Sequence, residues 1–157
     1  MTARTNRLKA QRSVSKNKLR LWIRLLRGTR YMESVLRARL RKRYSVTLSQ
    51  FDVLAALSRS RGGMIMSEVS RLLMVSNGNI TGIVDRLVDE GLVIRSLREG
   101  DRRTSFVRLT GKGQEKFKRM AEQHEKWVNE LLQDFSPEET EDLITMLSRL
   151  KKPIPGR

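Results

Sequence analysis

The chain has no cysteine and a single histidine, His124. The absence of cysteine excludes disulfide bonds, thiol chemistry and cysteine-ligated zinc, and one histidine is too few for a His-rich metal site. We therefore expect neither a cofactor nor a metal ion. The longest uninterrupted apolar run, Val53 to Leu57, is far shorter than a membrane span, so no membrane contact is expected either.

Signatures of catalysis are also missing. The sequence has no glycine-rich phosphate loop followed by Lys-Ser or Lys-Thr, and no paired carboxylates in a pattern typical of a catalytic pocket. Together with the lack of a nucleophilic cysteine, these absences favour a binding protein over an enzyme.

Acidic residues are nearly absent from the first 44 positions, and this shortage produces most of the net charge of +16. Residues 1–44 contain 15 Lys or Arg and only one acid, Glu33, whereas residues 45–110 contain 9 basic and 7 acidic residues and residues 111–157 contain 9 of each. A basic chain suggests a nucleic-acid partner. The excess of basic residues lies outside residues 66–110, which are expected below to contact DNA. These basic residues therefore either bind another partner or form a solvated face.

The length of 157 residues suits one domain with an arm. Residues 1–17 are polar and basic without a sustained apolar period, so we expect a mobile arm that touches DNA or is simply solvated. Their Arg, Ser and Thr content also fits a mitochondrial targeting peptide. Against targeting, the basic character continues without a break into the next segment.

Apolar spacing of three and four residues predicts a helix from Lys18 to Tyr44, with apolar residues on two sides. Two apolar sides suggest burial by two partners, the chain itself and a second subunit. Thr47 to Gln50 then form a capping box, which starts a helix that buries Phe51, Leu54 and Leu57.

A helix-turn-helix followed by a hairpin is predicted between Met66 and Thr110. Its first helix is expected to be capped by Ser67 and to end at Met74, and its second to run from Ser76 to Glu90, where Gly91 stops it. Two β-prone runs follow, 92–98 and 104–109, and residues 64–66 can add a short strand. We expect the inward-facing apolar residues of this hairpin to be Leu92, Ile94, Val107 and Leu109. This layout is a winged helix, which places a helix in a DNA major groove.

Two further helices are predicted after the hairpin. Thr110 caps a long helix whose apolar seam is better explained by a partner helix than by a lone domain; the seam contains Phe117, Met120, His124, Trp127, Leu131 and Phe135. Ser136 and Pro137 start a final helix that ends at Pro153 and is expected to bury Leu143, Ile144, Leu147 and Leu150.

Three motifs in this order resemble the MarR-type transcriptional regulators. They are the run from Ser76 to Leu87, the tetrapeptide starting at Glu90, and Asp101-Arg102-Arg103 followed after six residues by Thr110-Gly111-Lys112-Gly113. The helix order also fits, so the resemblance covers roughly residues 19–150.

The resemblance implies a mainly α fold with a small β-wing, acting as a homodimeric repressor on pseudo-palindromic double-stranded DNA. On this basis we expect a basic N-terminal arm at 1–17, a helical dimerisation region at 18–46 and 111–152, a winged helix-turn-helix DNA-binding region at 47–110 and a tail at 153–157. Such a regulator would work in the cytoplasm of a bacterial or archaeal cell, at the nucleoid when bound. The rival interpretation is a non-specific basic nucleic-acid-binding protein.

The expected DNA contacts begin at the N-terminal end of the second motif helix. Asn79 can pair with adenine and Thr81 can meet a thymine methyl, while Arg86 either reaches a phosphate or pairs with a neighbouring acid. Many family members carry a longer residue in place of Gly78 or Gly82, so shape readout is expected to be larger here; alternatively, these glycines only mark a weak helix. The candidate residues of this helix are Ser76, Asn77, Gly78, Asn79, Thr81 and Arg86.

The hairpin tip supplies the other DNA contacts. By resemblance, Arg103 enters a narrow minor groove and Asp101 holds its side chain by an ion pair; the alternative is a solvated turn. The candidate residues of the wing are Arg98, Asp101, Arg102 and Arg103.

In this family, small ligands, often aromatic acids or their coenzyme A thioesters, bind between the dimerisation helices and the winged helix. A band of arginines recurs along the first helix and suits an anionic effector, with a CoA thioester as the more specific expectation. The alternatives are a solvated basic face for the arginines and ordinary core packing for the aromatic residues. The candidate effector residues are Trp22, Arg24, Arg27, Arg30, Phe51 and His124.

Overall fold

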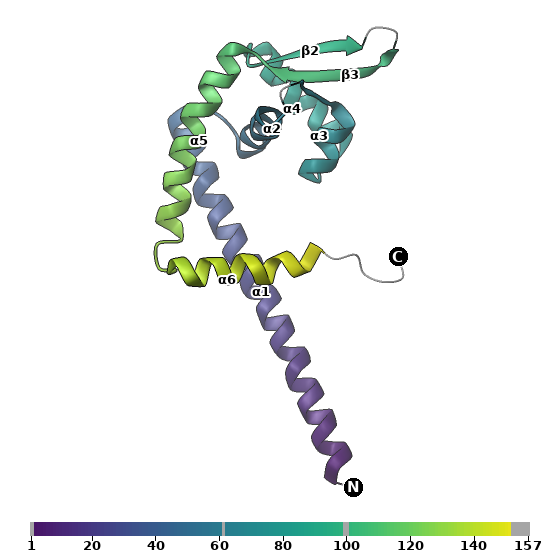
Figure 1. Cartoon of the computed structure of the whole chain (residues 1–157), viewed down its shortest axis with the longest axis vertical. Helices are drawn as coiled ribbons and strands as arrows, with labels where there is room; N and C mark the ends of the chain where they lie inside the picture. The colour runs from purple at the N-terminus through teal and green to yellow at the C-terminus, as the bar shows by residue number, and fades with distance from the viewer. Residues whose placement is uncertain (1, 61, 99–100, 152–157) are drawn as a thin grey trace.

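The computed structural model describes residues 2–60, 62–98 and 101–151, with side chains in 14–60, 62–96 and 106–150. These ranges form helices and one small sheet (Figure 1). In chain order, the elements are α1 (Thr2–Tyr44), α2 (Leu48–Ser58), β1 (Met64–Ile65), α3 (Met66–Leu73), α4 (Asn77–Asp89), β2 (Val93–Arg98), β3 (Asp101–Leu109), α5 (Gly111–Leu131), α6 (Pro137–Ser148) and the 3-10 turn η1 (Arg149–Lys151).

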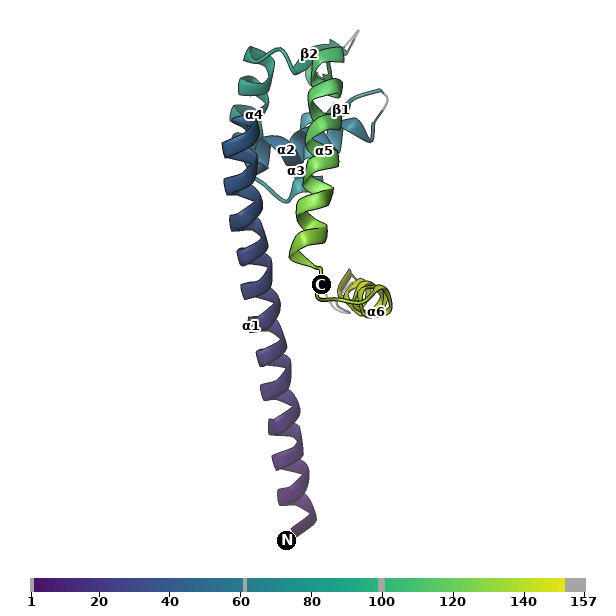
Figure 2. The same cartoon turned by 90° about the vertical axis from the view of Figure 1, so that its left-hand side faces the viewer.

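The molecule is elongated, with the sheet and the N-terminus at opposite ends of its longest axis (Figure 1). Helices α2, α3 and α4 gather beneath the sheet, and α5 connects this end to the last helix. Figure 2 shows that α1 runs beside α5 only over its C-terminal part and then continues alone. The C-terminal part of α1, with Leu36 and Leu40, therefore packs in the core, whereas its N-terminal part extends away from the rest of the chain as a free rod.

Capping residues account for most helix starts. The Thr47 hydroxyl accepts the Gln50 N–H and the Gln50 side chain accepts the Thr47 N–H, which confirms the predicted capping box. Ser76, Thr110 and Ser136 likewise accept an N–H three residues ahead. Ser67 was the wrong residue for the α3 cap. The cap position lies two residues earlier, at Ile65, whose N–H donates to the Glu68 carboxylate at 3.2 Å.

The sheet is antiparallel, in the order β1-β3-β2. Val93 pairs with Leu109 and Arg95 pairs with Val107, so these four residues share one face, while Ile94 pairs with Arg108 on the other. The prediction that Ile94 points inward is wrong: its side chain is 37% exposed, whereas Val93 is buried. The pairing register places Val93 inward, and a side-chain period of two then turns Ile94 outward.

The core joins α1, α2, α3, α4, α5 and the sheet. The seam of α5 was expected to face a partner helix, but the chain covers it with its own α1 and α2. The Phe117 ring lies 5.6 Å from that of Phe51, and Trp127 lies 6.4 Å from Tyr44. The helical spacing of the seam was right from Phe117 to Leu131, whereas Phe135 lies beyond the end of α5 and is exposed. The predicted partner was wrong, because an apolar stripe does not reveal which surface covers it.

The first helix begins at Thr2, so the prediction that it starts at Lys18 is wrong, while the mobility of the arm at residues 1–17 stays a prediction. This segment has no proline or glycine and contains Arg, Lys, Gln, Ala and Leu, which favour helices. Extension of an existing helix adds one hydrogen bond per residue without a new nucleation cost. A basic segment without an apolar period therefore continues the helix that follows it.

Helix α6 is amphipathic but uncovered. Leu143, Ile144 and Leu147 are 38%, 54% and 41% exposed, and Leu150, in η1, is 73% exposed, so the prediction that they are buried is wrong for a single chain. The ribbon of α6 lies away from α1 in Figure 2. The apolar side chains of α6 are thus available to another surface, and Pro153, its expected stop, lies outside the described residues.

Candidate nucleic-acid interface

A tight turn between α3 and α4 sets the angle of the second helix. Met74 ends α3 in the left-handed conformation, with φ 54°. The Ser70 hydroxyl donates to the Val75 carbonyl at 2.6 Å, which satisfies a backbone acceptor in the turn. On the inner face of α4, Ile80, Val84 and Leu87 are fully buried. The other face of α4 is consequently fixed in an outward orientation.

That outward face carries the residues expected to read DNA. The Ser76 hydroxyl caps α4 by accepting the Asn79 N–H, and the Thr81 hydroxyl donates to the Asn77 carbonyl at 2.9 Å. These bonds engage the hydroxyls of Ser76 and Thr81 within the helix, whereas the side chains of Asn77 and Asn79 are exposed. The structure therefore brings together on one exposed helix Ser76, Asn77, Gly78, Asn79, Thr81 and Arg86.

Gly78 and Gly82 are four residues apart on this face. A Cβ atom added to either glycine would meet nothing within 4 Å. Packing within the chain therefore does not require a glycine at either position, although glycine weakens a helix interior by about 1 kcal/mol relative to alanine. Because glycine has no side chain, the backbone of α4 is uncovered at these two positions, and another molecule can approach it closely.

Arg86 is exposed, and two of the three acids near it are engaged elsewhere. Asp85 forms an ion pair of 2.8 Å with Arg95 of β2. Glu90 accepts a hydrogen bond from the Gln50 amide at 3.1 Å and lies 3.6 Å from the Lys116 ammonium. The third acid, Asp89, is exposed one turn further along α4. Both alternatives for Arg86, a phosphate contact and a pair with a neighbouring acid, therefore stay predictions.

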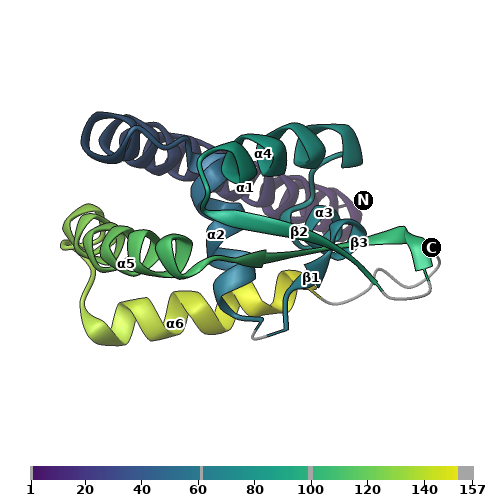
Figure 3. The ribbon, with the colours of Figure 1, turned by 90° about the horizontal axis from the view of Figure 1, so that it is seen from above.

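The hairpin of β2 and β3 extends beside α4 (Figure 3). The backbones of Arg98 and Asp101 pair with each other, after an irregularity between Leu97 and Arg98. The side chains of residues 97–105 and all of Glu99 and Gly100 lie outside the described part of the chain. The roles of Arg98, Asp101, Arg102 and Arg103 therefore remain predictions, placed at the hairpin end where the sequence put them.

The start of α5 is joined tightly to the loop between α4 and β2. The Thr110 N–H donates to the Leu92 carbonyl at 3.0 Å, and the Lys112 ammonium donates to the Glu90 carbonyl at 2.8 Å. A Cβ on Gly113 would lie 2.0 Å from the Leu92 carbonyl oxygen, so only glycine fits there. This contact gives a physical reason for a motif that the sequence supplied only by resemblance.

The effector candidates are not brought together in one chain. Phe51 and His124 stack in the core, with ring centroids 4.6 Å apart, and partial burial lowers the pKa of His124. Trp22 is 59% exposed on the free part of α1. Arg24 and Arg27 are exposed as well, and at 100° per residue they lie on the side of α1 away from Trp22. The expected single pocket is therefore absent from the described part of this chain.

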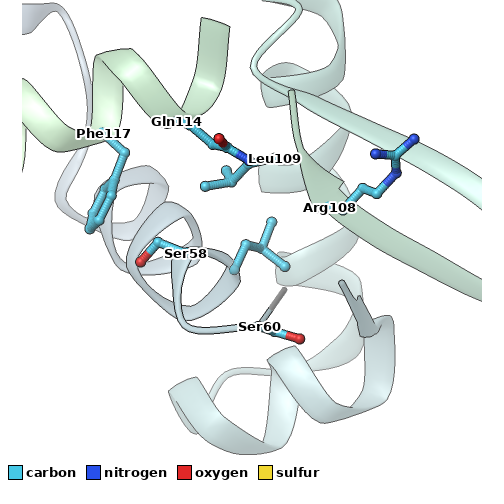
Figure 4. Close-up of a pocket in the computed structure, with 7 residues that line it drawn as sticks. Ser58, Ser60, Arg108, Leu109, Gln114 and Phe117 are labelled. Atoms are coloured by element: carbon cyan, nitrogen blue, oxygen red, sulfur yellow. The ribbon is translucent and has the colours of Figure 1, made fainter. Parts of the chain in front are cut away.

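A hollow of about 380 Å³ lies between the end of α2, β3 and the start of α5 (Figure 4). Its wall is apolar at Phe117 and Leu109, while the Arg108 guanidinium is directed away from them. The Ser58 hydroxyl donates to the Ala55 carbonyl within α2, and the Ser60 hydroxyl donates to the Gly63 carbonyl in the loop that follows. The hollow thus offers apolar contact without a charge directed into it.

Sequence reasoning missed the polar contacts that orient α4, namely those of Gln50, Asp85, Glu90 and Arg95. The pair of Arg95 with Asp85 had no local signal, because the sequence placed Ile94 on the inward face of the hairpin and Arg95 on the outward one. The register of β2 against β3, which reverses these faces, is seen only in the structure.

A short helix, a tight turn, a second helix with an exposed polar face and an antiparallel hairpin together define a winged-helix DNA-binding protein. The sequence model of the MarR family matches residues 44–104. The chain is 34% identical to the HTH-type transcriptional regulator PecS of Dickeya dadantii over 70% of this chain and 68% of PecS. It is 27% identical to the homoprotocatechuate degradative operon repressor of Escherichia coli over 68% of this chain and 71% of that protein.

Solved structures agree with these sequence matches. A mutant MarR from Escherichia coli, complexed with operator DNA, superposes with a TM-score of 0.75 at 25% identity, over 87% of this chain and 97% of that one. The chain belongs to the MarR family. It is a DNA-binding transcription regulator rather than an enzyme. Within the described ranges, no helix combines the length and apolarity needed to cross a bilayer.

Proposed function

We propose that the protein is a homodimeric repressor that binds a pseudo-palindromic operator and is released by a small anionic effector. The main observation in support of a dimer is the exposed apolar surface of the terminal helices α1 and α6. Leu19 and Trp22 of α1 are 58% and 59% exposed, and Leu143 and Ile144 of α6 are 38% and 54% exposed. A single chain leaves these large side chains in water, which is unfavourable by roughly 25 cal/mol per Å² of apolar surface.

A second copy of the chain is the partner that fits both surfaces. Dimers of identical chains use one self-complementary patch twice, so the helices of dimerisation regions 18–46 and 111–152 would cover each other. Such a pair presents two α4 helices. Recognition helices that enter successive major grooves on one side of a duplex lie about 34–36 Å apart. A symmetric protein then selects a pseudo-palindromic site.

The exposed face of α4 supports direct contact with that site, and the arginines at the hairpin end support contact with the adjacent minor groove. A relative's structure contains operator DNA, and another relative is a repressor, so repression from an operator is consistent with both. The work is done at the chromosome, in the cytoplasm of a bacterial or archaeal cell.

The proposed effector is an aromatic acid or its CoA thioester. Support comes from the basic character of α1, because arginine binds carboxylate and phosphate groups through paired N–H donors. Since Trp22 and Arg24 lie on different sides of α1, the proposal concerns the class of ligand rather than one pocket formed by the six candidate residues. A ligand lowers operator affinity only by its differential affinity for the DNA-bound and free conformations.

The decisive experiment selects bound sequences from a random duplex pool with the purified chain and measures its mass in solution. A dimer that enriches a pseudo-palindrome is the expected result, and Arg103→Ala should then weaken binding several-fold and lower its dependence on salt. A monomer that binds unrelated duplexes equally well would instead support a non-specific basic nucleic-acid-binding protein. Titration of the complex with free aromatic acids and their CoA thioesters tests the effector: if neither kind releases DNA, this part of the proposal fails.

A further inference from the structure

The free part of α1 is the largest feature that operator recognition does not use. Among the described side chains of α1, Leu36 is the first buried one, and those from Val14 to Arg24 are all exposed. A helix of 43 residues extends about 64 Å at 1.5 Å per residue. In Figures 1 and 2 its N-terminal end points away from the body of the molecule. The charge excess of the chain is concentrated on this rod.

The rod has two different sides. Leu19, Trp22 and Leu26 fall on the side that continues downstream as the buried Leu36 and Leu40, at helical spacing. This apolar side is the one that the proposed dimer covers. The opposite side carries a basic face, which we define as Lys16, Arg20, Arg24 and Arg27.

The charges of this basic face are uncompensated. No acid occurs in the sequence before Glu33, and none of the four residues forms an ion pair within the described ranges. All four side chains are exposed, and Arg20, Arg24 and Arg27 border one shallow hollow on the surface of α1. Four cations spread over twelve residues, about 16 Å from the first to the last along the helix axis, suit an extended polyanion.

The basic face is also remote from the operator-reading helix. The wing and the N-terminal end of α1 are at opposite ends of the longest axis (Figure 1), and α4 packs on α2, α3 and β2 near the wing. A duplex held by α4 therefore does not lie along the basic face of the same chain. The basic face is therefore not used by a duplex that the same chain holds through α4.

We propose that the basic face binds the phosphate backbone of a second DNA duplex, so that the operator-bound dimer bridges two DNA segments. The inference rests on the proposed function, which supplies the first duplex. Arginine forks bind phosphate oxygens without reading sequence. DNA that flanks the operator is present at a high effective concentration, so modest affinity suffices for bridging. An anionic membrane would need the apolar side of the same helix, and the dimer occupies that side.

A two-duplex capture experiment tests the inference. The operator duplex selected above is fixed to beads and saturated with protein, and an unrelated labelled duplex is then added. Wild-type protein should retain the labelled duplex. The triple variant Arg20→Gln, Arg24→Gln, Arg27→Gln should retain at least roughly tenfold less, with operator affinity within about twofold of wild type, because three phosphate contacts are lost at the second duplex only. The salt slope of second-duplex binding should fall by about 2.7, at 0.9 per contact.

Two matched variants separate the basic face from charge in general. Lys118→Gln, Arg119→Gln, Lys126→Gln removes the same charge from exposed positions of α5 and should leave capture unchanged. Replacement of the three arginines by lysine keeps the charge and should preserve most of the capture. Glutamine favours helices, so the first variant is expected to fold, and its circular dichroism and dimer mass confirm this.

Three results would overturn the inference. They are an operator-bound wild type that captures no second duplex, equal loss of capture in the α5 variant, and binding of anionic phospholipid vesicles through the basic face in preference to DNA. All three leave operator binding intact and so leave the proposed function standing. Failure of the wild type to select any operator would count against the proposed function instead.

Discussion

The guanidinium of Arg95 on β2 lies 2.8 Å from the carboxylate of Asp85 on α4, and this ion pair connects the base of the wing to the helix that is expected to read DNA. The two side chains are 36% and 52% exposed, so the pair contributes at most about 1 kcal/mol to folding. Its expected effect is on geometry, because α4 and the wing are proposed to contact adjacent grooves of one duplex and must then keep their relative position.

Breaking this pair should therefore affect DNA binding more than stability. Asp85→Asn and Arg95→Gln should each weaken operator binding by roughly fivefold while the free energy of unfolding changes by less than about 1 kcal/mol. The double variant should be no worse than either single one, as a double-mutant cycle would measure. Glu130→Gln breaks the exposed Arg39–Glu130 pair far from the wing and serves as the control. Equal losses of DNA binding in that control would contradict the assignment.

Replacement of either glycine of α4 by alanine should raise the stability of the protein and weaken its binding to DNA. Gly82→Ala and Gly78→Ala should stabilise the protein by about 0.5–1 kcal/mol, since space is open and alanine favours the helix. Operator affinity should fall several-fold, because a methyl group now separates the backbone from the duplex. Gly28→Ala in α1 also has open space and should stabilise without affecting DNA binding. Denaturant titration and operator binding measure both effects, and unchanged operator affinity would show that the glycines have no contact role.

Gly113 should be intolerant of any side chain. Gly113→Ala places a methyl 2.0 Å from the Leu92 carbonyl oxygen, so α5 must shift, at a cost of roughly 1–3 kcal/mol. Gly111→Ala, two residues earlier, meets nothing within 4 Å and should be nearly neutral. Urea unfolding of the two variants provides the comparison. Similar midpoints would mean that the junction between α5 and β2 is more adaptable than its geometry indicates.

His124 should make the protein less stable in mild acid. Burial lowers its pKa below 6.5, so the unfolded chain takes up a proton before the folded chain does. Stability is therefore fully present above about pH 6.5 and declines as the pH falls toward the folded pKa. Asp52 acts in the opposite sense at lower pH, because burial and, secondarily, Glu33 raise its pKa.

Comparison with His124→Gln isolates the histidine, since the Asp52 contribution is common to both proteins. The thermal unfolding midpoint, measured between about pH 5 and 7, should fall less steeply with decreasing pH in the variant than in the wild type. Identical pH profiles would mean that the imidazole can protonate while stacked on Phe51.

The elements with local signals were predictable from the sequence. Thr47, Ser76, Thr110 and Ser136 mark helix starts through a hydrogen bond to a residue three positions ahead, and the structure confirms each one. The exposed polar face of α4 followed from its pattern as well. Signals of this kind depend only on neighbouring residues, so they do not require knowledge of the rest of the fold.

What depends on distant residues was not predictable. The direction of Ile94 is set by its pairing with Arg108, and the cover of the α5 seam is set by α1 and α2. The ion pair of Asp85 with Arg95 joins two elements whose relative position no local pattern contains. The helical start of α1 is a different kind of error: composition indicated a flexible arm, whereas helix extension needs no apolar period.

The attachment of α5 to the end of α4, through Lys112, Lys116 and Glu90, makes α5 a lever. Its 21 residues extend about 31 Å, so a displacement of roughly 3 Å at the far end corresponds to a tilt of only about 5° at the joint. In the proposed dimer, both α4 helices would then move at once and in opposite senses. A molecule that separated the distant ends of the two α5 helices by roughly 3 Å would thus change the spacing of the two α4 helices relative to successive major grooves.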